Sequence, residues 1–289
     1  MIGRVIKFHN SFFFVENGDE LIACSLRGLL KRFKNRTPVC PGDFVDFDQN
    51  ADGTGVINRV VDRKNLLIRP AAANVDQIIL TFAVREPEIH PLLLNRFLVL
   101  AEASGIDNIS ICLNKIDLDE HFSLYGYENL YDIIRVSARN GFNLERLKSK
   151  LADKITVFTG PSGVGKSSLL NALDPSINQT VGKISDRIKR GKNTTRVAEL
   201  LKFADGYLVD TPGFSAVELQ ELGVDEKNLA HFFKEFHDFA VRCRFNPCSH
   251  SHEPDCAVKA AVENALISSE RYSAYLSLLK ELNERKSKL

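Results

Sequence analysis

Three short segments of this sequence combine residue types that bind a nucleobase, phosphate and a divalent cation. Asn-Lys-Ile-Asp occupies residues 114–117, Gly-Pro-Ser-Gly-Val-Gly-Lys-Ser-Ser occupies residues 160–168, and Asp-Thr-Pro-Gly occupies residues 210–213. An ordinary GTPase carries the glycine-rich segment first, DxxG second and NKxD last. The rotated order here should still form a GTP site, but the phosphate-sensing segments then end the domain.

The glycine-rich segment matches G-x-x-x-x-G-K-[ST] without a mismatch. It follows the β-type run 155–158 and opens the helical pattern 168–173, which is the context of a phosphate-binding loop rather than a plain glycine turn. Its glycines let backbone N–H groups converge on phosphate oxygens, aided by the helix dipole. Lys166 should reach the β- and γ-phosphates, and the Ser167 hydroxyl should bind Mg²⁺. The predicted phosphate-binding residues are Gly160, Pro161, Ser162, Gly163, Val164, Gly165, Lys166, Ser167 and Ser168.

Asp-Thr-Pro-Gly is expected to face that loop. Asp210 ends the apolar run 207–209, and a buried parallel strand that runs into an acid suits a Mg²⁺-directed carboxylate. Gly213 can offer its N–H to the γ-phosphate because it has no side chain. Alone, this string could be an ordinary turn. About 45 residues after a phosphate loop, it predicts part of the catalytic site.

The intervening segment, residues 183–196, is basic and contains two threonines. A threonine hydroxyl here can close over Mg²⁺ only while the γ-phosphate is present, which would make the segment a switch. We expect Thr195 to be this ligand, with Thr194 as the alternative. A solvated basic loop is the competing interpretation. The predicted catalytic residues are therefore Lys166, Thr195, Asp210 and Gly213.

Asn-Lys-Ile-Asp lies at the end of the strand-like run 109–113, where ligands bind in open α/β sheets. Guanine presents N1–H and N2–H₂ as adjacent donors, so the Asp117 carboxylate can accept both, whereas adenine would leave it unpaired. Asn114 should bond the other edge of the base, and the Lys115 stem should pack on the ring. We expect a supporting backbone contact to the base from Ser137-Ala138-Arg139, which follows the strand-like run 133–136. The predicted base-binding residues are Asn114, Lys115, Ile116, Asp117, Ser137 and Ala138, and the predicted nucleotide is GTP.

Length, charge and hydropathy bound the class of protein. The 289 residues can bury a large core, and the net charge of +1 creates no global attraction to nucleic acid. No apolar run reaches the ~18 residues of a membrane span, and the N-terminus shows no cleavable signal. We therefore expect a cytoplasmic chain without a membrane segment. We also expect it to act as a monomer.

Residues 1–68 differ from the rest of the chain. Five short β-rich runs alternate there with Asn, Gly, Asp and Pro turns, which predicts a small barrel. Within it, residues 27–36 carry five basic residues and no acid, so an oligonucleotide-binding (OB) barrel and a solvated loop are both compatible. Residues 69–217 show the α/β pattern around the nucleotide motifs.

Residues 218–289 contain a short-range cluster of cysteine and histidine. Three thiols and an imidazole suit tetrahedral Zn²⁺, and cytosolic thiols stay reduced, which disfavours a disulfide. Apolar residues at helical spacing over 257–289 predict packed helices, and hence an α-helical zinc-binding domain. His252 could replace His250 as the histidine ligand. The predicted zinc ligands are Cys243, Cys248, His250 and Cys256.

Motif order, barrel and C-x₄-C-x-H-x₅-C cluster together resemble the ribosome small subunit-dependent GTPase A family of circularly permuted GTPases. The resemblance covers nearly the whole chain. It implies an OB barrel, a permuted GTPase domain and a zinc domain, with GTP, Mg²⁺ and Zn²⁺ bound. It also implies binding to the small ribosomal subunit and its rRNA, a role in late maturation of that subunit, and GTP hydrolysis stimulated by it.

Two positions depart from the patterns of related GTPases. The family's switch segment usually reads G-x-H-T-T, and here Asn193 replaces the histidine; asparagine can orient water but cannot act as a general base. Phe214 stands where signalling GTPases carry a water-orienting glutamine. We therefore expect slow intrinsic hydrolysis that the ribosome completes. Two other functions are compatible with the sequence: a GTP-dependent switch that acts on a protein partner, and an RNA-binding module whose nucleotide site does not turn over.

Overall fold

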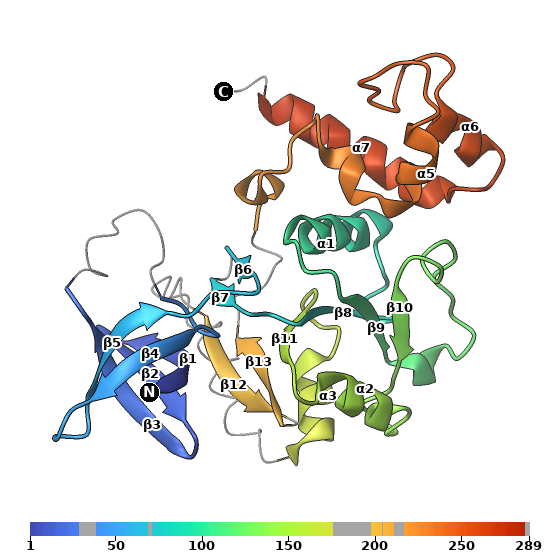
Figure 1. The fold of residues 1–289 in the computed structure, drawn as a ribbon. Helices are drawn as coiled ribbons and strands as arrows, with labels where there is room; N and C mark the ends of the chain where they lie inside the picture. The colour runs from blue at the N-terminus through green and yellow to red at the C-terminus, as the bar shows by residue number, and fades with distance from the viewer. Residues whose placement is uncertain (29–38, 69–70, 176–197, 204, 211–216, 287–289) are drawn as a thin grey trace.

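The chain folds into a barrel, an α/β sheet and a helical region that follow one another along the sequence (Figure 1). The computed structural model describes residues 1–28, 39–68, 71–175, 198–203, 205–210 and 217–286.

The N-terminal strands form a closed five-stranded barrel in the order β1-β2-β3-β5-β4. Neighbours are antiparallel except β3 and β5, which pair in parallel and close the barrel. Along each strand buried residues alternate with partly or fully exposed ones, so one face of every strand fills the barrel interior. The barrel and its five strands, expected from the turn spacing, are confirmed. The strands are β1 (Ile2–His9), β2 (Phe12–Asn17), β3 (Glu20–Leu26), β4 (Phe44–Gln49) and β5 (Gly55–Val60).

A six-stranded sheet in the order β10-β9-β8-β11-β13-β12 forms the centre of the molecule. All pairs are parallel except β12–β13, which form an antiparallel hairpin at one edge. Every residue of β8, β9 and β11 is buried, as expected for strands covered on both faces. The strands are β8 (Gln77–Ala83), β9 (Ile109–Asn114), β10 (Asp132–Arg135), β11 (Ile155–Thr159), β12 (Glu199–Phe203) and β13 (Gly206–Asp210).

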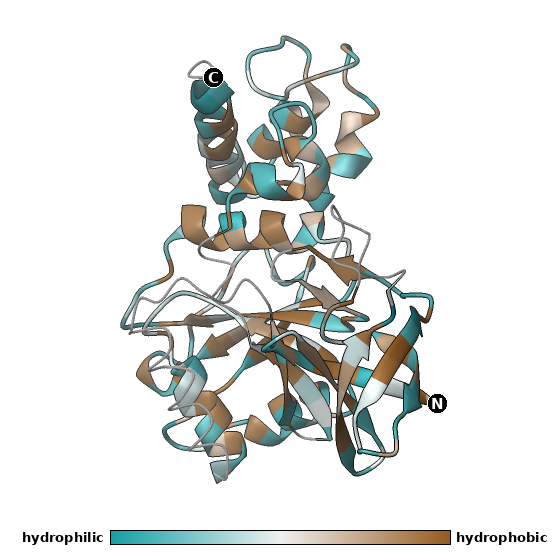
Figure 2. Cartoon of the chain, turned by 90° about the vertical axis from the view of Figure 1, so that its left-hand side faces the viewer, coloured by the Kyte–Doolittle hydropathy of each residue, from teal (hydrophilic) through white to brown (hydrophobic). Residues whose placement is uncertain are grey.

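Helices cover both faces of this sheet. Helix α1 (Pro91–Ala103) packs on one face in one hydrophobic core, and α2 (Leu144–Leu151) and α3 (Lys166–Leu173) share a second core on the other face. Coloured by hydropathy, the sheet strands are largely hydrophobic between these layers (Figure 2). The arrangement places the carboxyl ends of β8, β9 and β11 at one edge, where the loops that bear the motifs emerge.

The C-terminal helices lie on α1 rather than apart from it (Figure 1). Their buried side chains, such as Val258 and Tyr275, belong to the same continuous core as the buried face of α1. The predicted helical pattern is split into two helices, because Ala265 between them adopts a left-handed backbone with φ 56°. No helix within the described parts of the chain is both long and apolar enough to cross a bilayer. The elements are η5 (Leu219–Leu222), η6 (Leu229–Phe232), η7 (Lys234–Phe236), α5 (His237–Ala240), α6 (Ala257–Glu263) and α7 (Ser269–Lys286).

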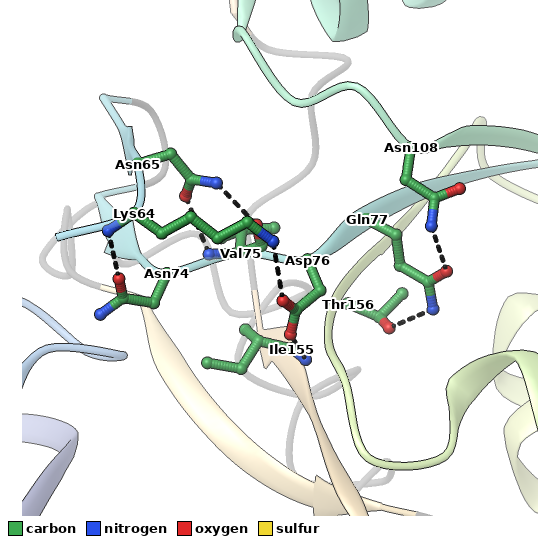
Figure 3. A network of polar contacts seen from close by, with 9 residues as sticks. All are labelled: Lys64, Asn65, Asn74, Val75, Asp76, Gln77, Asn108, Ile155 and Thr156. Atoms are coloured by element: carbon green, nitrogen blue, oxygen red, sulfur yellow. Dashed lines mark hydrogen bonds and ion pairs between the residues drawn. The ribbon is translucent and has the colours of Figure 1, made fainter.

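A structured junction joins the barrel to the sheet (Figure 3). The Asn65 side chain forms two hydrogen bonds, of 2.8 and 2.9 Å, with the backbone of Val75. One step further, the Asp76 carboxylate accepts a 2.9 Å hydrogen bond from the Ile155 N–H at the start of β11. These bonds connect the linker, which is the segment between β5 and β8, to the strand that leads into the glycine-rich loop. The linker also contains two short antiparallel strands, β6 (Leu66–Leu67) and β7 (Ala72–Ala73).

The barrel also contacts the β12–β13 hairpin directly. The Arg4 guanidinium lies 4.7 Å from the ring centroid of Phe44 and 4.9 Å from that of Tyr207, so it bridges barrel and hairpin. Lys7 of β1 pairs with Glu199 of β12 at 3.6 Å. The hairpin that ends at Asp210 is therefore held from the side by the barrel.

Candidate nucleotide-binding site

The glycine-rich loop connects β11 to α3 and approaches two neighbouring strands closely. A Cβ added to Gly160 would lie 2.0 Å from the carbonyl oxygen of Thr81 on β8, a distance that excludes every other residue type. Gly165 has φ 91°, and a Cβ there would lie 2.4 Å from Nδ2 of Asn114. The predicted strand–loop–helix context is thus present, and two of its glycines are fixed by contacts with other strands.

Lys166 points back over its own loop. Its Nζ donates hydrogen bonds to the carbonyl oxygens of Gly160 at 2.7 Å and Pro161 at 2.6 Å. Burial lowers the pKa of this ammonium group, because the surrounding protein solvates the charge less well than water does. A phosphate placed in the loop would supply the missing negative charge, so this lysine is suited to bind an anion.

The Asn114 side chain joins three segments that are distant in sequence. It is 1% exposed, its Nδ2 donates to the Val164 carbonyl at 2.9 Å, and its Oδ1 accepts from the Ala138 N–H at 3.2 Å. One amide therefore fixes the spacing between the NKID segment, the glycine-rich loop and the Ser-Ala segment. The expected convergence of these segments is confirmed.

The Asp117 carboxylate is held by a neighbouring serine. It lies in the 3₁₀ turn η2 (Ile116–Leu118), and the Ser137 hydroxyl donates to its Oδ1 at 2.5 Å. The same Ser137 oxygen accepts hydrogen bonds from the N–H groups of Arg139 and Asn140 at 3.2 and 3.3 Å. Because these donors occupy the serine lone pairs, its proton is directed at the carboxylate, which fixes the orientation of Asp117.

A cavity of about 330 Å³ opens between these segments, at the carboxyl ends of the strands. Its volume is at the lower end of the range for small-molecule sites. Residues of the NKID segment line it together with residues of the glycine-rich loop and α3. The lining residues are Glu86, Asn114, Lys115, Asp117, Leu118, Ala138, Arg139, Gly165 and Ser168.

The segment after β8 forms a further wall that the sequence motifs do not include. The Lys115 ammonium donates to the carbonyl oxygen of Glu86, and a Cβ on Gly163 would lie 3.6 Å from Cδ of Pro87. Glu86 adopts φ 54°, a left-handed backbone that is unfavourable for this residue type. The one feature of the sequence that could have indicated this wall is its position directly after a central strand, where ligands bind in α/β sheets.

The remaining predicted residues are partly outside the described structure. Asp210 ends β13, and β13 runs parallel to β11, so its backbone reaches the edge of the sheet that bears the glycine-rich loop. Thr194, Thr195 and Gly213 lie outside the described residues, as do Asn193 and Phe214. The prediction that they form the switch segments is untested.

The four predicted zinc ligands come together in the C-terminal region. Their ligand atoms all lie within 4.8 Å of one another. Cys243 Sγ is 3.8 Å from Cys256 Sγ and 3.6 Å from His250 Nδ1, and Cys256 Sγ is 3.4 Å from the same nitrogen. A tetrahedral Zn²⁺ with bonds of about 2.3 Å to sulfur and 2.0 Å to nitrogen requires edges of roughly 3.8 and 3.5 Å. Cys243, His250 and Cys256 therefore have the spacing that this ion requires, and Cys248 Sγ lies within 4.8 Å of each of them.

His250, and not His252, belongs to this cluster. The His252 ring is exposed and bonded through Nδ1 to the Ser251 hydroxyl. Helix α7 fixes the loop that bears His250: Tyr272 donates to the His250 carbonyl at 2.7 Å, and Tyr275 donates to the Ser249 carbonyl at 2.5 Å.

A phosphate-binding loop after β11, an NKxD turn after β9 and DxxG after β13 define a P-loop GTPase whose motifs are circularly permuted. The model of the RsgA GTPase family matches residues 60–220, and the model of the RsgA N-terminal domain matches residues 2–57. The chain belongs to the RsgA GTPase family and is a GTP-hydrolysing enzyme.

Similarity to individual relatives extends over the full length. The small ribosomal subunit biogenesis GTPase RsgA of Thermotoga maritima is 42% identical over 296 residues, covering 99% of this chain and 98% of the relative. The protein of the same name from Clostridium beijerinckii is 41% identical over 293 residues, covering 98% of each. The crystal structure of YjeQ from Thermotoga maritima matches with a TM-score of 0.80 and 38% identity, covering 97% of this chain and 98% of that one. The crystal structure of YloQ, a circularly permuted GTPase, matches with a TM-score of 0.79 and 35% identity, covering 98% of this chain and 95% of YloQ.

Proposed function

We propose that this GTPase acts in late maturation of the small ribosomal subunit and that the subunit stimulates its GTP hydrolysis. The relatives named as GTPases of small ribosomal subunit biogenesis match over almost their whole length, so every part of their architecture has a counterpart here. The single observation that carries the nucleotide site is the buried amide of Asn114, which joins the base-binding and phosphate-binding segments in one cleft.

Guanine is proposed to occupy the cavity beside Asp117. Its two adjacent donors match the carboxylate that Ser137 orients, and the Lys115 stem supplies a flat apolar surface for the ring. The phosphates would extend along the glycine-rich loop to Lys166. There a phosphate oxygen would replace the loop carbonyls that the ammonium group contacts.

Mg²⁺ and Zn²⁺ are proposed to bind at separate places. Ser167 and Thr195 would hold Mg²⁺ beside the phosphates, with Asp210 directed towards it, and the cation would neutralise charge that develops during hydrolysis. Cys243, Cys248, His250 and Cys256 would hold a structural Zn²⁺, as their mutual distances allow. Tyr272 and Tyr275 tie the zinc loop to α7, which shares a hydrophobic core with α1.

Partner binding is proposed to involve the barrel and the subunit's rRNA. The barrel contacts the β12–β13 hairpin, whose ends lead into the two predicted switch segments, so binding at the barrel can influence the catalytic site. Asn193 and Phe214 supply no general base, which agrees with slow hydrolysis until the ribosome is engaged. We further propose that the chain works as a cytoplasmic monomer.

A phosphate-release assay tests this function. The purified chain is given GTP with and without purified small ribosomal subunits, and Lys166→Ala serves as the inactive control. We expect slow turnover alone and an acceleration on the order of tenfold or more with subunits, as other GTPases show with their activators. Fast turnover that subunits leave unchanged would contradict the proposal.

Co-sedimentation separates the alternatives. The chain should travel with small subunits in the presence of a non-hydrolysable GTP analogue and should dissociate with GDP. No association in either state would favour a switch that acts on a protein partner. Association without any hydrolysis would favour an RNA-binding module with an inactive nucleotide site.

A further inference from the structure

Arg271 on α7 is a buried charge where the C-terminal helices meet α1 and the segment that bears Tyr127. Its side chain is 1% exposed and forms a two-pronged ion pair with Glu235, in which Nη2 lies 2.8 Å from Oε2. Its guanidinium also lies 5.1 Å from the ring centroids of Tyr127 and Phe233. Burying an ion pair often stabilises a fold less than apolar packing would, so its better-attested use is to specify one geometry.

The remaining hydrogen bond of this guanidinium fixes an amide on α1. Arg271 Nη1 donates to Asn95 Oδ1 at 2.8 Å. Arginine has donors only, so the amide oxygen of Asn95 must face it and the amide nitrogen must face the other way. That nitrogen donates to the Pro91 carbonyl at 2.9 Å and to the Tyr127 hydroxyl at 2.8 Å. Arg271 thus determines how the start of α1 meets Tyr127.

Tyr127 lies in the connection between the two base-binding segments. Residues 118–131, here called the crossover, run from the turn that bears Asp117 to β10. Strand β10 leads in turn to Ser137, which holds the Asp117 carboxylate. Any displacement of the crossover would move both segments that meet the base.

The start of α1 supports the opposite wall of the same cavity. Helix α1 begins at Pro91, shortly after Glu86, whose carbonyl accepts the Lys115 ammonium. The amide of Asn95 contacts both Pro91 and Tyr127, so it spans the two supports of the base cavity.

Apolar side chains pack across this contact but leave part of it unfilled. A hollow of about 410 Å³ lies beside the network, between the crossover at Phe122–Tyr125, the start of α1 at Pro91 and the C-terminal residues Ile267–Glu270. It holds none of the nucleotide motifs. The hydrogen bonds of Arg271 and Asn95 therefore add direction to the apolar packing that joins the three parts.

We propose that Arg271 is a positioning residue for guanine recognition. Acting through Asn95 and Tyr127, it holds the crossover and the start of α1 where residues 114–117 and 137–138 fit the base. The C-terminal helices are then part of the nucleotide site's framework. This inference rests on the proposed function, because it assumes that guanine lies beside Asp117.

The test compares three single substitutions in the full chain. Arg271→Lys keeps the charge but loses the fork that bonds Glu235 and Asn95. Tyr127→Phe removes one hydroxyl from the network and serves if Arg271→Lys does not fold. Tyr275→Phe is the matched control: it removes an equally buried hydroxyl from α7, but its partner, the Ser249 carbonyl, lies within the C-terminal region. For each protein the dissociation constants of GDP and inosine diphosphate, the KM and kcat for GTP, and the urea midpoint are measured.

Inosine diphosphate lacks the 2-amino group of guanine, so the ratio of the two affinities reports how well Asp117 is placed. We expect Arg271→Lys to raise KM and the GDP dissociation constant on the order of five- to tenfold, and Tyr127→Phe about threefold. The GDP preference over inosine diphosphate should fall, and kcat should stay within about twofold. Tyr275→Phe should leave all four nucleotide values unchanged, although it loses similar stability in urea.

Two results would overturn the inference. One is an unchanged GDP-to-inosine diphosphate ratio in both network variants, and the other is an equal fall in Tyr275→Phe. Failure of the proposed function looks different, because wild-type protein would then bind ADP as well as GDP. With guanine preference intact in wild type and unaltered in the variants, only the role of Arg271 fails.

Discussion

Replacement of Gly165 by alanine is the sharpest test of how the base-binding and phosphate-binding segments fit together. The new Cβ would stand 2.4 Å from Asn114 Nδ2, so the amide would have to move away. Movement would break its 2.9 Å hydrogen bond to the Val164 carbonyl and leave a buried donor unpaired. The left-handed backbone at φ 91° adds strain for any residue with a Cβ.

The magnitude follows from these two effects. An unpaired buried donor costs about 1–3 kcal/mol. Left-handed strain costs about 1–2 kcal/mol. If about 2 kcal/mol of the sum appears in binding, GDP affinity falls on the order of thirtyfold, since each 1.4 kcal/mol is a factor of ten. The rest should appear as a lower free energy of unfolding.

Gly105→Ala is the matched control for strain. Gly105 has φ +71°, and a Cβ there would meet nothing within 4 Å. This variant should lose stability on the order of 1 kcal/mol but bind GDP as wild type does. Titration with a fluorescent GDP analogue and urea unfolding measure both quantities. A folded Gly165→Ala protein with wild-type GDP affinity would refute the fitted contact between Asn114 and the loop.

Two further predictions concern the base-binding turn and the zinc cluster. Asp117→Asn should weaken GDP binding on the order of a hundredfold. It should also improve binding of xanthosine diphosphate, whose C2 carbonyl accepts a hydrogen bond from the new amide. If a competition titration gave this variant the same GDP affinity as wild type, the base assignment would be contradicted. Cys256→Ser should remove zinc from the purified protein, measured by elemental analysis, and lower the thermal midpoint, whereas His252→Ala should retain the metal because its ring lies outside the cluster. Loss of zinc in both variants would mean that the cluster rearranges around a different histidine.

Sequence patterns were sufficient to predict the sites whose residues lie close together along the chain. The glycine-rich loop was predictable because a strand, three glycines and Gly-Lys-Ser are adjacent along the chain. The zinc ligands were predictable for the same reason, since they all lie between residues 243 and 256. The choice between His250 and His252 was not predictable, because both spacings are compatible with a tetrahedral ion. Only the folded loop, held by Tyr272 and Tyr275, decides it.

Two features were not predicted from the sequence: the wall formed by Glu86 and Pro87, and the network around Arg271. Neither belongs to a motif, and their contacts join residues that are 29 and 176 positions apart in the chain. Chain order places the C-terminal region directly after the predicted switch segments. In space it packs on α1 and on the crossover, at the base end of the site.

The amino-acid sequence alone determined that the protein has a phosphate-binding loop, a guanine-type NKxD segment, a barrel and a metal cluster, because each depends on residues that are neighbours along the chain. Tertiary structure decided that one buried amide joins the predicted base and phosphate segments, and that an arginine of the C-terminal region bonds Asn95 of α1. The physical reason is that hydrogen-bond geometry between distant segments is set by the packing of whole strands and helices, which no local spacing encodes.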